Sequence, residues 1–387
     1  MKRNRILRGL NIFFSGAGVL FVIGLIVVLT TNFASITTLA SIIGIIECNS
    51  LYPISTQQMI TGAGSGIVDA LKDPYSKYLD QATWKDLKER IEAKFGGIGV
   101  YILQDEAGRL KIVAPIEGTP AYKEGLKNGD IILKINGEST ANMTSDHAAQ
   151  LMRGDPGTQL LLTIYRESEK KDYEFKIIRE IINVPSVRSE EIKNHPEIGY
   201  LRLNQFSSQS DKELVDSLND LMNEKEIKGL ILDLRNNGGG DFEVAVSIAA
   251  VFLNDREVVS SVDADGNKEV RRAESGGGTF KLPMVVLVNK DSASASEILA
   301  GALHDNNRAL LVGEKTYGKG LVQTVFPLPD GGALKLTTQK YFTPLGTDID
   351  QVGIMPDFRV ENDPASSQDR QLDRAVEILI QQISKGS

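Results

Sequence analysis

A turn of small residues around Ser294 is the part of the chain whose residue types could carry out a reaction. A predicted apolar strand at 284–289 breaks here into a run with three serines, Ser292, Ser294 and Ser296, and a helix is predicted from Ser296 onward. A serine at such a turn exposes its hydroxyl, and free N–H groups at the helix start can hold the oxyanion formed when a carbonyl is attacked. The pattern indicates a nucleophile, although each serine could instead be a turn former or a helix cap.

A lone lysine between two glycines, Lys319, is the candidate base for this nucleophile. The chain has 3 histidines. In a helix that follows Ser294, His304 would lie about 15 Å along the axis, too far for a hydrogen bond. His147 and His195 are expected in solvated positions. A lysine at its ordinary pKa of about 10.4 is protonated at neutral pH, so the base role requires burial or a cationic neighbour.

A triple glycine at 238–240 ends another predicted strand just before a helix. Glycines let backbone N–H groups approach a ligand closely, and a helix start favours a developing anion. A flexible strand-to-helix turn is the alternative. No pair of histidines has the helical spacing of metal ligands and the carboxylates are scattered, so neither a metal site nor a cofactor is predicted.

The elements that must position these residues follow from length and periodicity. The chain has 387 residues, more than the roughly 250 to 300 of a single core, so two or more units are expected. Helical spacing at 56–71 and 81–94 predicts a helical cap. Short strands around a helix at 145–152, begun by an N-cap serine or aspartate, predict a β-rich domain. From 198 to 313 strands and helices alternate, which predicts an α/β core whose site lies beyond the carboxyl ends of parallel strands.

Charge and cysteine content exclude several classes of protein. The formal net charge is −8, and no basic tract appears after the first residues, which argues against a nucleic-acid partner. The single cysteine, Cys48, excludes an internal disulfide and a thiolate metal cluster. The glutamate before it does not fit a lipid-modification signal, so a free thiol is expected.

The N-terminus has the pattern of a membrane anchor. Four basic residues precede an uncharged stretch at 9–46, whose most apolar part begins at residue 12 and ends at 28 or 29. About 20 apolar residues span a bilayer, and basic residues stay on the cytoplasmic side. We therefore expect a single-pass anchor with the catalytic part outside the cytoplasm. A cleaved signal peptide is the alternative, but no clean small-x-small cleavage site follows.

Several motifs in a fixed order resemble one protein family, the carboxyl-terminal processing peptidases or tail-specific proteases of peptidase family S41. The resemblance runs from about Thr61 to Asp357. It rests on these segments: 73–79 (DPYSKYL), 118–121 (GTPA), 129–137 (GDIILKING), 233–240 (DLRNNGGG), 292–298 (SASASEI), 317–323 (YGKGLVQ) and 353–357 (GIMPD). Members of this family are membrane-anchored or secreted serine proteases with an inserted PDZ domain.

The resemblance assigns roles that residue types alone leave open. It implies Ser294 as nucleophile, Lys319 as general base and Gln323 as the residue that orients the lysine. It implies that the backbone N–H groups of Gly240 and Ala295 hold the oxyanion.

The resemblance also implies a tail-binding groove in the PDZ domain. Gly97, Ile98 and Gly99 would present N–H groups to a terminal carboxylate, while the peptide adds as a strand and an apolar pocket takes its last side chain. Arg153, at the end of the domain's helix, is a candidate regulatory residue. The segments 90–95 and 180–185 would form a hinge to the core.

The predicted fold is α/β, α+β overall, with four parts: a cytoplasmic stub and transmembrane anchor at 1–34, a helical cap at 35–95, a PDZ domain at 96–180 and a protease core at 181–387. The predicted activity is a membrane-anchored serine endopeptidase acting on proteins with nonpolar carboxyl termini. Alternatives are a non-catalytic tail-binding scaffold or adaptor, which would need no Ser–Lys pair, and a crotonase-like acyl-transfer enzyme, which would need no PDZ domain. The sequence does not decide between a homodimer and an activating partner protein.

Overall fold

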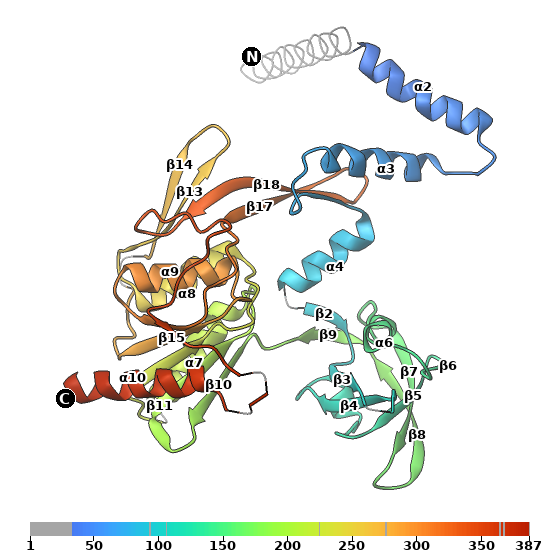
Figure 1. Cartoon of the computed structure of the whole chain (residues 1–387). Helices are drawn as coiled ribbons and strands as arrows, with labels where there is room; N and C mark the ends of the chain where they lie inside the picture. Colours follow the sequence, from blue (N-terminus) through green and yellow to red (C-terminus); the bar gives the residue numbers. More distant parts are fainter. Residues whose placement is uncertain are drawn as a thin grey trace, which may run out of the picture. The chain divides into compact units, whose positions relative to one another are not determined.

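The computed structural model of the chain describes residues 33–92, 94–105, 107–223, 225–274, 277–363, 365–366 and 368–386 (Figure 1). The chain forms two compact units, residues 1–80 and 81–387. The predicted transmembrane span lies outside the described residues. Within the part that is described, no helix combines the length and the apolar character needed to cross a bilayer. The boundaries between the four predicted parts remain predictions.

Within residues 33–80, the described part of the first unit, the chain forms two helices and a short strand. They are α2 (Phe33–Asn49), α3 (Thr56–Asp69) and β1 (Lys77–Leu79). A capping box begins α3: the N–H of Gln58 donates to Ser55 Oγ at 3.2 Å, and the N–H of Ser55 donates to Gln58 Oε1 at 2.9 Å. In the following turn the Asp73 carboxylate accepts from the N–H of Tyr75 at 3.0 Å. The predicted helix at 56–71 is confirmed, two residues shorter.

The second unit begins with helix α4 (Gln81–Glu92) and continues into a small β-rich domain. Its elements are β2 (Lys94–Gly97), β3 (Val100–Gln104), β4 (Leu110–Pro115), α5 (Pro120–Lys123), β5 (Ile131–Ile135), β6 (Glu138–Ser139), α6 (Ser145–Met152), β7 (Gln159–Arg166), β8 (Lys171–Ile178) and β9 (Glu180–Asn183). The sheet has the order β3-β4-β5-β7-β8, with β6 on β5. Alternate side chains of β7 are buried, as expected for a sheet with one face on a core.

The start of helix α6 differs from the prediction. Neither a serine nor an aspartate inside the predicted helix caps it; Thr144, one residue earlier, is the N-cap. Its backbone is extended and its Oγ1 accepts from the N–H of His147 at 3.3 Å. Threonine satisfies the helix N–H groups in the same way as serine, so residue type alone did not fix the position.

A six-stranded sheet forms the centre of the remaining chain. Its elements are β10 (Val187–Ile192), β11 (His195–Leu203), α7 (Ser210–Asn223), β12 (Gly229–Asp233), α8 (Phe242–Phe252), β15 (Met284–Val288), α9 (Ala295–Asp305), β16 (Leu310–Gly313), β19 (Phe358–Arg359) and α10 (Arg370–Gly386). The order is β10-β11-β12-β15-β16-β19, and every pair except β10–β11 is parallel. The predicted α/β core is confirmed.

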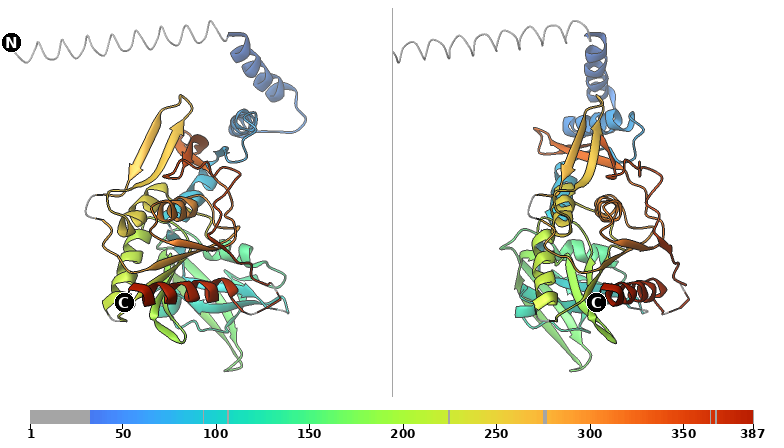
Figure 2. Two further views of the ribbon diagram at one scale, coloured as in Figure 1. Left: turned by 60° about the vertical axis from the view of Figure 1, so that its left-hand side comes forward. Right: turned by 90° about the vertical axis from the view of Figure 1, so that its left-hand side faces the viewer.

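Helices cover both faces of this sheet, which explains its continuous apolar strands. Side chains of α7, α8 and α9 share one core cluster with Leu230 and Val286, whereas α10 packs on the other face against Ile231 and Val285 (Figures 1 and 2). All residues of β12 and β15 are buried. Burying a valine or leucine side chain contributes about 1.5 to 3 kcal/mol, so these two strands anchor the turns that follow them.

Two antiparallel elements lie outside the central sheet. The hairpins β13 (Glu257–Asp263) with β14 (Lys268–Arg272) and β17 (Leu321–Pro327) with β18 (Ala333–Phe342) join through pairing of β13 with β18. The two connections of the small domain, predicted as hinge segments, pair with each other as the antiparallel ribbon β2–β9.

Candidate active site

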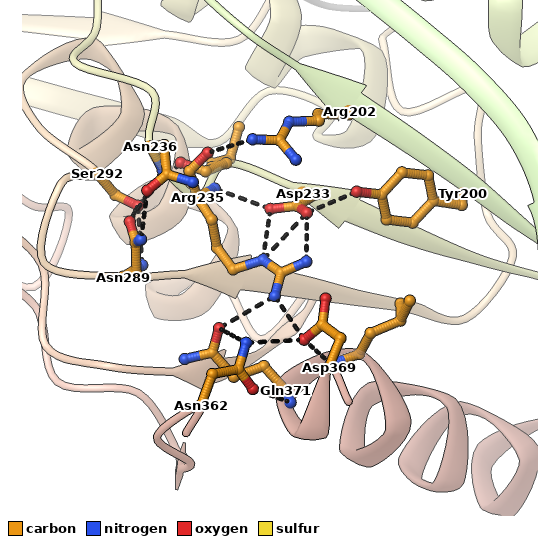
Figure 3. A network of polar contacts seen from close by, with 12 residues as sticks. Tyr200, Arg202, Asp233, Arg235, Asn236, Asn289, Ser292, Asn362, Asp369 and Gln371 are labelled. Carbon is orange, nitrogen blue, oxygen red and sulfur yellow. Dashed lines mark hydrogen bonds and ion pairs between the residues drawn. The ribbon is translucent and has the colours of Figure 1, made fainter. Parts of the chain in front are cut away.

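The turns after strands β12 and β15 are joined at the carboxyl edge of the sheet. Asn236 and Asn289 each follow one of these strands and exchange hydrogen bonds (Figure 3). The N–H of Asn236 donates to Asn289 Oδ1 at 2.9 Å, and Asn289 Nδ2 donates to Asn236 Oδ1 at 2.8 Å. The turn that carries the glycines is therefore fixed against the turn that carries the serines.

The three serines of the second turn have different surroundings. Ser292 is fully buried, and its Oγ donates to the carbonyl of Leu234 at 2.8 Å. Ser296 is also fully buried, and its Oγ donates to the carbonyl of Asn237 at 2.8 Å. Both hydroxyls thus tie the serine turn to the glycine turn. Ser294 is half-buried and lines a cavity that is described below.

Ser294 has a backbone conformation that side chains rarely adopt. Its φ is 56° and its ψ is −117°, and helix α9 begins at the next residue. Such a strained strand-to-helix turn costs on the order of 1 to 3 kcal/mol and holds the side chain away from both elements, as in nucleophile elbows. Because the neighbouring hydrogen bonds hold this turn, the conformation positions the Ser294 hydroxyl at the start of the helix.

The glycine turn lies directly against Ser294. A Cβ on Gly239, where φ is 98°, would lie 2.9 Å from the Cβ of Ser294 and 2.9 Å from the backbone nitrogen of Ala295. A Cβ on Gly240 would lie 2.1 Å from the carbonyl oxygen of Phe206. Only glycine fits at these two positions. Gly240 and Ala295 line the same cavity as Ser294, and their part in an oxyanion hole remains a prediction.

A buried carboxylate, Glu297, connects the serine turn to the lysine loop. It is fully buried on the first turn of α9. Its Oε2 accepts from the N–H of Ser294 and from the N–H of Lys319, both at 2.9 Å. Its Oε1 accepts from Thr316 Oγ1 at 2.6 Å and from the N–H of Gly318 at 2.7 Å. One carboxylate therefore holds the backbone of both predicted catalytic residues.

The amine of Lys319 is in an environment that disfavours its charged form. Burial and the positive charge of Lys335 lower the pKa of Lys319 below its ordinary value, while the Glu297 carboxylate opposes part of this shift. The loop is held from a second side because the Tyr341 hydroxyl donates to the Lys319 carbonyl. A lysine base requires burial or a cationic neighbour, and Lys319 has both.

One cavity of about 400 Å³ brings together the predicted residues of the core. Its lining includes Ser294, Ala295, Gly240, Lys319 and Gln323. The Gln323 side chain lies here and donates from Nε2 to the carbonyl of Leu321 at 3.2 Å. An orienting role for Gln323 toward the lysine therefore remains a prediction.

The predicted helix after Ser294 does include His304, which lies at its far end. Its Nδ1 is 3.0 Å from Asp305 Oδ1 and its Nε2 is 3.3 Å from Asp357 Oδ1. His304 does not line the catalytic cavity.

Comparisons with known proteins show the family of the chain. The model of "Peptidase family S41" matches residues 197–360. A carboxy-terminal-processing protease of Bartonella bacilliformis is 41% identical over 309 residues, which cover 79% of this chain and 70% of that protein. A carboxyl-terminal-processing protease of a Picosynechococcus species is 38% identical over 87% of this chain and 84% of its own length. The chain belongs to the carboxyl-terminal-processing proteases of family S41. This protease is thus a serine-type C-terminal processing peptidase.

The fold of the protease agrees with a solved relative. The photosystem II D1 C-terminal processing protease is 28% identical, with a TM-score of 0.51 over 84% of this chain and 88% of that one. A "PDZ domain" model matches residues 111–166, so the predicted PDZ domain is confirmed.

The PDZ domain carries a groove at the open edge of its sheet. Strand β3 is an edge strand of this sheet, where it pairs with β4. A cavity of about 220 Å³ beside it is lined by Gly97, Ile98 and Gly99 and by the α6 residues Ala149 and Met152. The three predicted tail-binding residues therefore lie together at an edge where a peptide could add as a strand.

Arg153 lies at the point where the groove approaches helix α4. It is the C-cap of α6, as predicted, and lines the tail groove. Its Nη1 lies 3.4 Å from Asp86 Oδ1 on α4. On the same helix, Leu87 and Ile91 line the cavity that holds Ser294 and Lys319. Helix α4 thus contacts one residue of the groove through Asp86 and lines the Ser294 cavity through Leu87 and Ile91.

A second buried network holds the end of strand β12, directly before the glycine turn. Asp233 is fully buried and accepts from Arg235 Nη2 at 2.7 Å and from the Tyr200 hydroxyl at 2.6 Å (Figure 3). Arg235 Nη1 also donates to Asp369 Oδ1 at 2.8 Å, just before helix α10. Burial and the Asp233 carboxylate raise the pKa of the Tyr200 hydroxyl, which stays protonated as a donor.

Two residues of the site were not singled out from the sequence. Glu297 could have been found from the capping-box spacing S-x-x-E, since it lies three residues after Ser294 at a helix start. Lys335 gives no comparable signal, because its place in the cavity depends on how β18 pairs with β17.

Proposed function

We propose that this protease is a membrane-anchored endopeptidase that hydrolyses peptide bonds with a Ser294–Lys319 pair and selects substrates by nonpolar carboxyl termini. One observation carries the catalytic part of the proposal. A single cavity is lined by a serine on a strained turn, the helix start beside it, a glycine-only loop and a lysine of lowered pKa.

In the proposed reaction, neutral Lys319 Nζ takes the proton from Ser294 Oγ as Oγ bonds to the scissile carbonyl carbon. The N–H groups of Gly240 and Ala295 stabilise the resulting oxyanion. Its collapse breaks the C–N bond, and Lys319 gives the proton to the leaving amine. Water then attacks the acyl ester, passes a proton to Lys319, and Ser294 leaves with that proton. Gln323 would hold the lysine in place.

Two substitutions test this pair. Ser294→Ala and Lys319→Ala should each lower kcat/KM by at least about 10³-fold with little change in the thermal unfolding midpoint, and the double variant should lose little more. Ser296→Ala is the matched control, because it removes a structural hydroxyl of the same turn. If Ser296→Ala were inactive while Ser294→Ala kept its activity, the assignment of the nucleophile would be wrong.

The pH dependence gives an independent test of the base. Since Lys319 must be neutral to act, kcat/KM should rise with pH until the lowered pKa of Lys319 is passed. If kcat/KM instead rose with an apparent pKa near 6.5 and activity were lost on chemical modification of histidine, a histidine mechanism would be supported.

The PDZ groove supports the second part of the proposal, recognition of the tail. An exposed nonpolar carboxyl terminus would add to β3, with its carboxylate at the N–H groups of Gly97, Ile98 and Gly99 and its last side chain near Met152. A tail peptide should bind at least about tenfold more weakly once its terminus is amidated or its last residue is replaced by aspartate. Equal affinity for the free and the amidated peptide would contradict carboxylate recognition.

We propose further that a bound tail regulates the catalytic cavity through α4. Arg153 meets both the tail groove and Asp86, and α4 also lines the catalytic cavity. A tail peptide should therefore raise cleavage of an untailed reporter at saturating reporter, and Arg153→Ala should remove this activation with tail affinity within a few fold. Lys85→Ala, which removes the neighbouring contact to Asp155, is the matched control. Unchanged rate and tail preference after deletion of residues 96–179 would contradict both roles of the PDZ domain.

The location of the protease is proposed from the N-terminal sequence. Lys2, Arg3, Arg5 and Arg8 precede the uncharged stretch, so the N-terminus would stay in the cytoplasm and the catalytic part would face the other side. Membrane fractionation and protease protection of intact cells test both statements. Release of the chain from membranes by carbonate would contradict a spanning anchor.

A further inference from the structure

Strand β18 brings a second lysine, Lys335, into the catalytic cavity. Lys335 pairs with Val325 in the β17–β18 hairpin, and both residues line the cavity. Tyr341, further along the same strand, also lines the cavity. The hairpin therefore places the half-buried Lys335 in the same cavity as Lys319.

We propose that Lys335 is a positioning residue of the catalytic cavity, whose positive charge keeps the Lys319 amine in its neutral, proton-accepting form. This inference rests on the proposed Ser294–Lys319 mechanism. It assigns a role to a residue outside that pair.

The groups that line the cavity around Lys319 come from α4, α8, α9, β17 and β18, and β17 contributes Gln323 and Val325. Helix α9 contributes the Glu297 carboxylate, and β18 contributes Lys335 and the Tyr341 hydroxyl that donates to the Lys319 carbonyl. Helix α4 contributes only apolar side chains to the wall of the cavity, as described above. At the start of α8, Asp241 lines the cavity, and its Oδ1 accepts from the N–H of Glu243 at 2.8 Å and from the N–H of Val244 at 3.2 Å.

These surroundings make a nearby positive charge important. The two oxygens of Glu297 favour the ammonium form of Lys319, which cannot accept a proton. Burial acts in the opposite direction, and so does a second ammonium in the same cavity. A cationic neighbour is an established way to activate a lysine in proteins, because two like charges in a partly desolvated site repel. Lys335 thus offsets the carboxylate that positions the lysine loop.

Strand β18 also supplies a matched control. Lys340 lies on the same strand, and its Nζ contacts Asp348 Oδ2 at 2.6 Å. It does not line the cavity. Removing its charge changes the net charge of the hairpin by the same amount as removing that of Lys335.

The experiment measures kcat/KM against pH for the full chain with a reporter peptide that has no ionisable group. Lys335→Met should move the acid limb of the profile upward by about one pH unit, which is about a tenfold loss of activity at pH values below the limb. The high-pH plateau should be kept. Lys335→Arg should retain the wild-type limb because the positive charge remains, and Lys340→Met should retain it too.

The proposal is overturned if Lys335→Met leaves the acid limb in place, or if it lowers activity equally at every pH. The second outcome would assign Lys335 to substrate binding or to structure. Lys335→Gln is a second uncharged variant for the case in which methionine disturbs folding, and unfolding midpoints are measured for all variants. Failure of the proposed function itself is recognised separately, because Lys319→Ala would then retain activity and the wild-type acid limb.

Discussion

Two fully buried carboxylates lie near the catalytic edge of the sheet, and they are bound in different ways. Glu297 accepts only from neutral donors, three backbone N–H groups and the Thr316 hydroxyl. Asp233 faces the guanidinium of Arg235 at 2.7 Å (Figure 3). The backbone N–H donors around Glu297 tie their segments to its carboxylate, whereas the Arg235 cation compensates the negative charge of Asp233. Glu297 therefore fixes the backbone of the segments that carry Ser294 and Lys319. The Asp233–Arg235 pair instead connects the end of β12 to Asp369, just before α10.

The largest effect expected from this comparison is on folding. Arg235→Leu leaves Asp233 buried without its cation and should lower the free energy of unfolding by about 3 to 5 kcal/mol. Chemical denaturation measures this. Arg202→Leu is the matched control, since its guanidinium meets only the carbonyl of Arg235, at 3.4 Å. Joint replacement of Asp233 and Arg235 by leucine should recover part of the loss, because no buried charge then remains unpaired. Equal losses for the two single arginine variants would contradict the comparison.

Glu297→Gln should lower stability less than Arg235→Leu does, but it should lower activity strongly. The amide keeps the shape of the side chain but presents an NH₂ group to two donors, so it loses hydrogen bonds to the Ser294 side or to the Thr316 side. We expect a loss of about 1 to 3 kcal/mol in stability, typical of buried donors left without an acceptor. In the folded fraction, kcat/KM should fall by roughly 10² or more, because both catalytic segments move. Activity within twofold of wild type would show that Glu297 has only a structural role.

The smallest effect on stability is expected at His304, a partly exposed histidine between two carboxylates. Both ring nitrogens of His304 face carboxylates, and the pKa of His304 is raised: burial lowers it, but Asp305 and Asp357 outweigh burial. The charged form is thus favoured in the folded protein. Its stabilisation is fully present below the unfolded pKa of about 6.5 and is lost as pH rises through the higher folded pKa.

His304→Gln should therefore lower stability at pH 5.5 by roughly 0.5 kcal/mol, since solvent screens a ring with 35% exposure, and should have less effect at pH 8. Thermal unfolding at both pH values measures the difference. His147→Gln, at an exposed position, is the control. A loss that is larger at pH 8 than at pH 5.5 would reverse the sign of this argument.

The parts of the fold that could be predicted are those with a strong local pattern. Strands β12 and β15 are continuous apolar runs between turn residues, and α9 follows a run of small residues, so their existence and their order were evident. The hairpins β13–β14 and β17–β18 were not predicted, because their strands mix polar and apolar residues over partly exposed faces. Helix α10 was missed although its apolar residues recur at helical spacing, as in Leu372, Val376 and Leu379.

The site was only partly predictable for a related reason. Ser294, Lys319 and the glycine turn belong to short motifs, and the structure brings them to one cavity. The contacts that condition them join distant segments. Glu297 accepts from Gly318, 21 positions further along the chain, and Arg235 meets Asp369 across 134 positions. No local pattern encodes such pairs, because the fold must first bring the segments together.

The left-handed backbone of Ser294 has a practical consequence for work with the inactive enzyme. Alanine removes the hydroxyl but keeps a Cβ on a residue with φ of 56°, so it retains the strain of the turn. Glycine removes the hydroxyl and, because it has no Cβ, also the strain of the turn. An inactive protease intended to trap bound substrates should therefore be more robust as Ser294→Gly than as Ser294→Ala, and more robust than the active enzyme. At Ser294, the backbone conformation that presents the hydroxyl also lowers the stability of the fold.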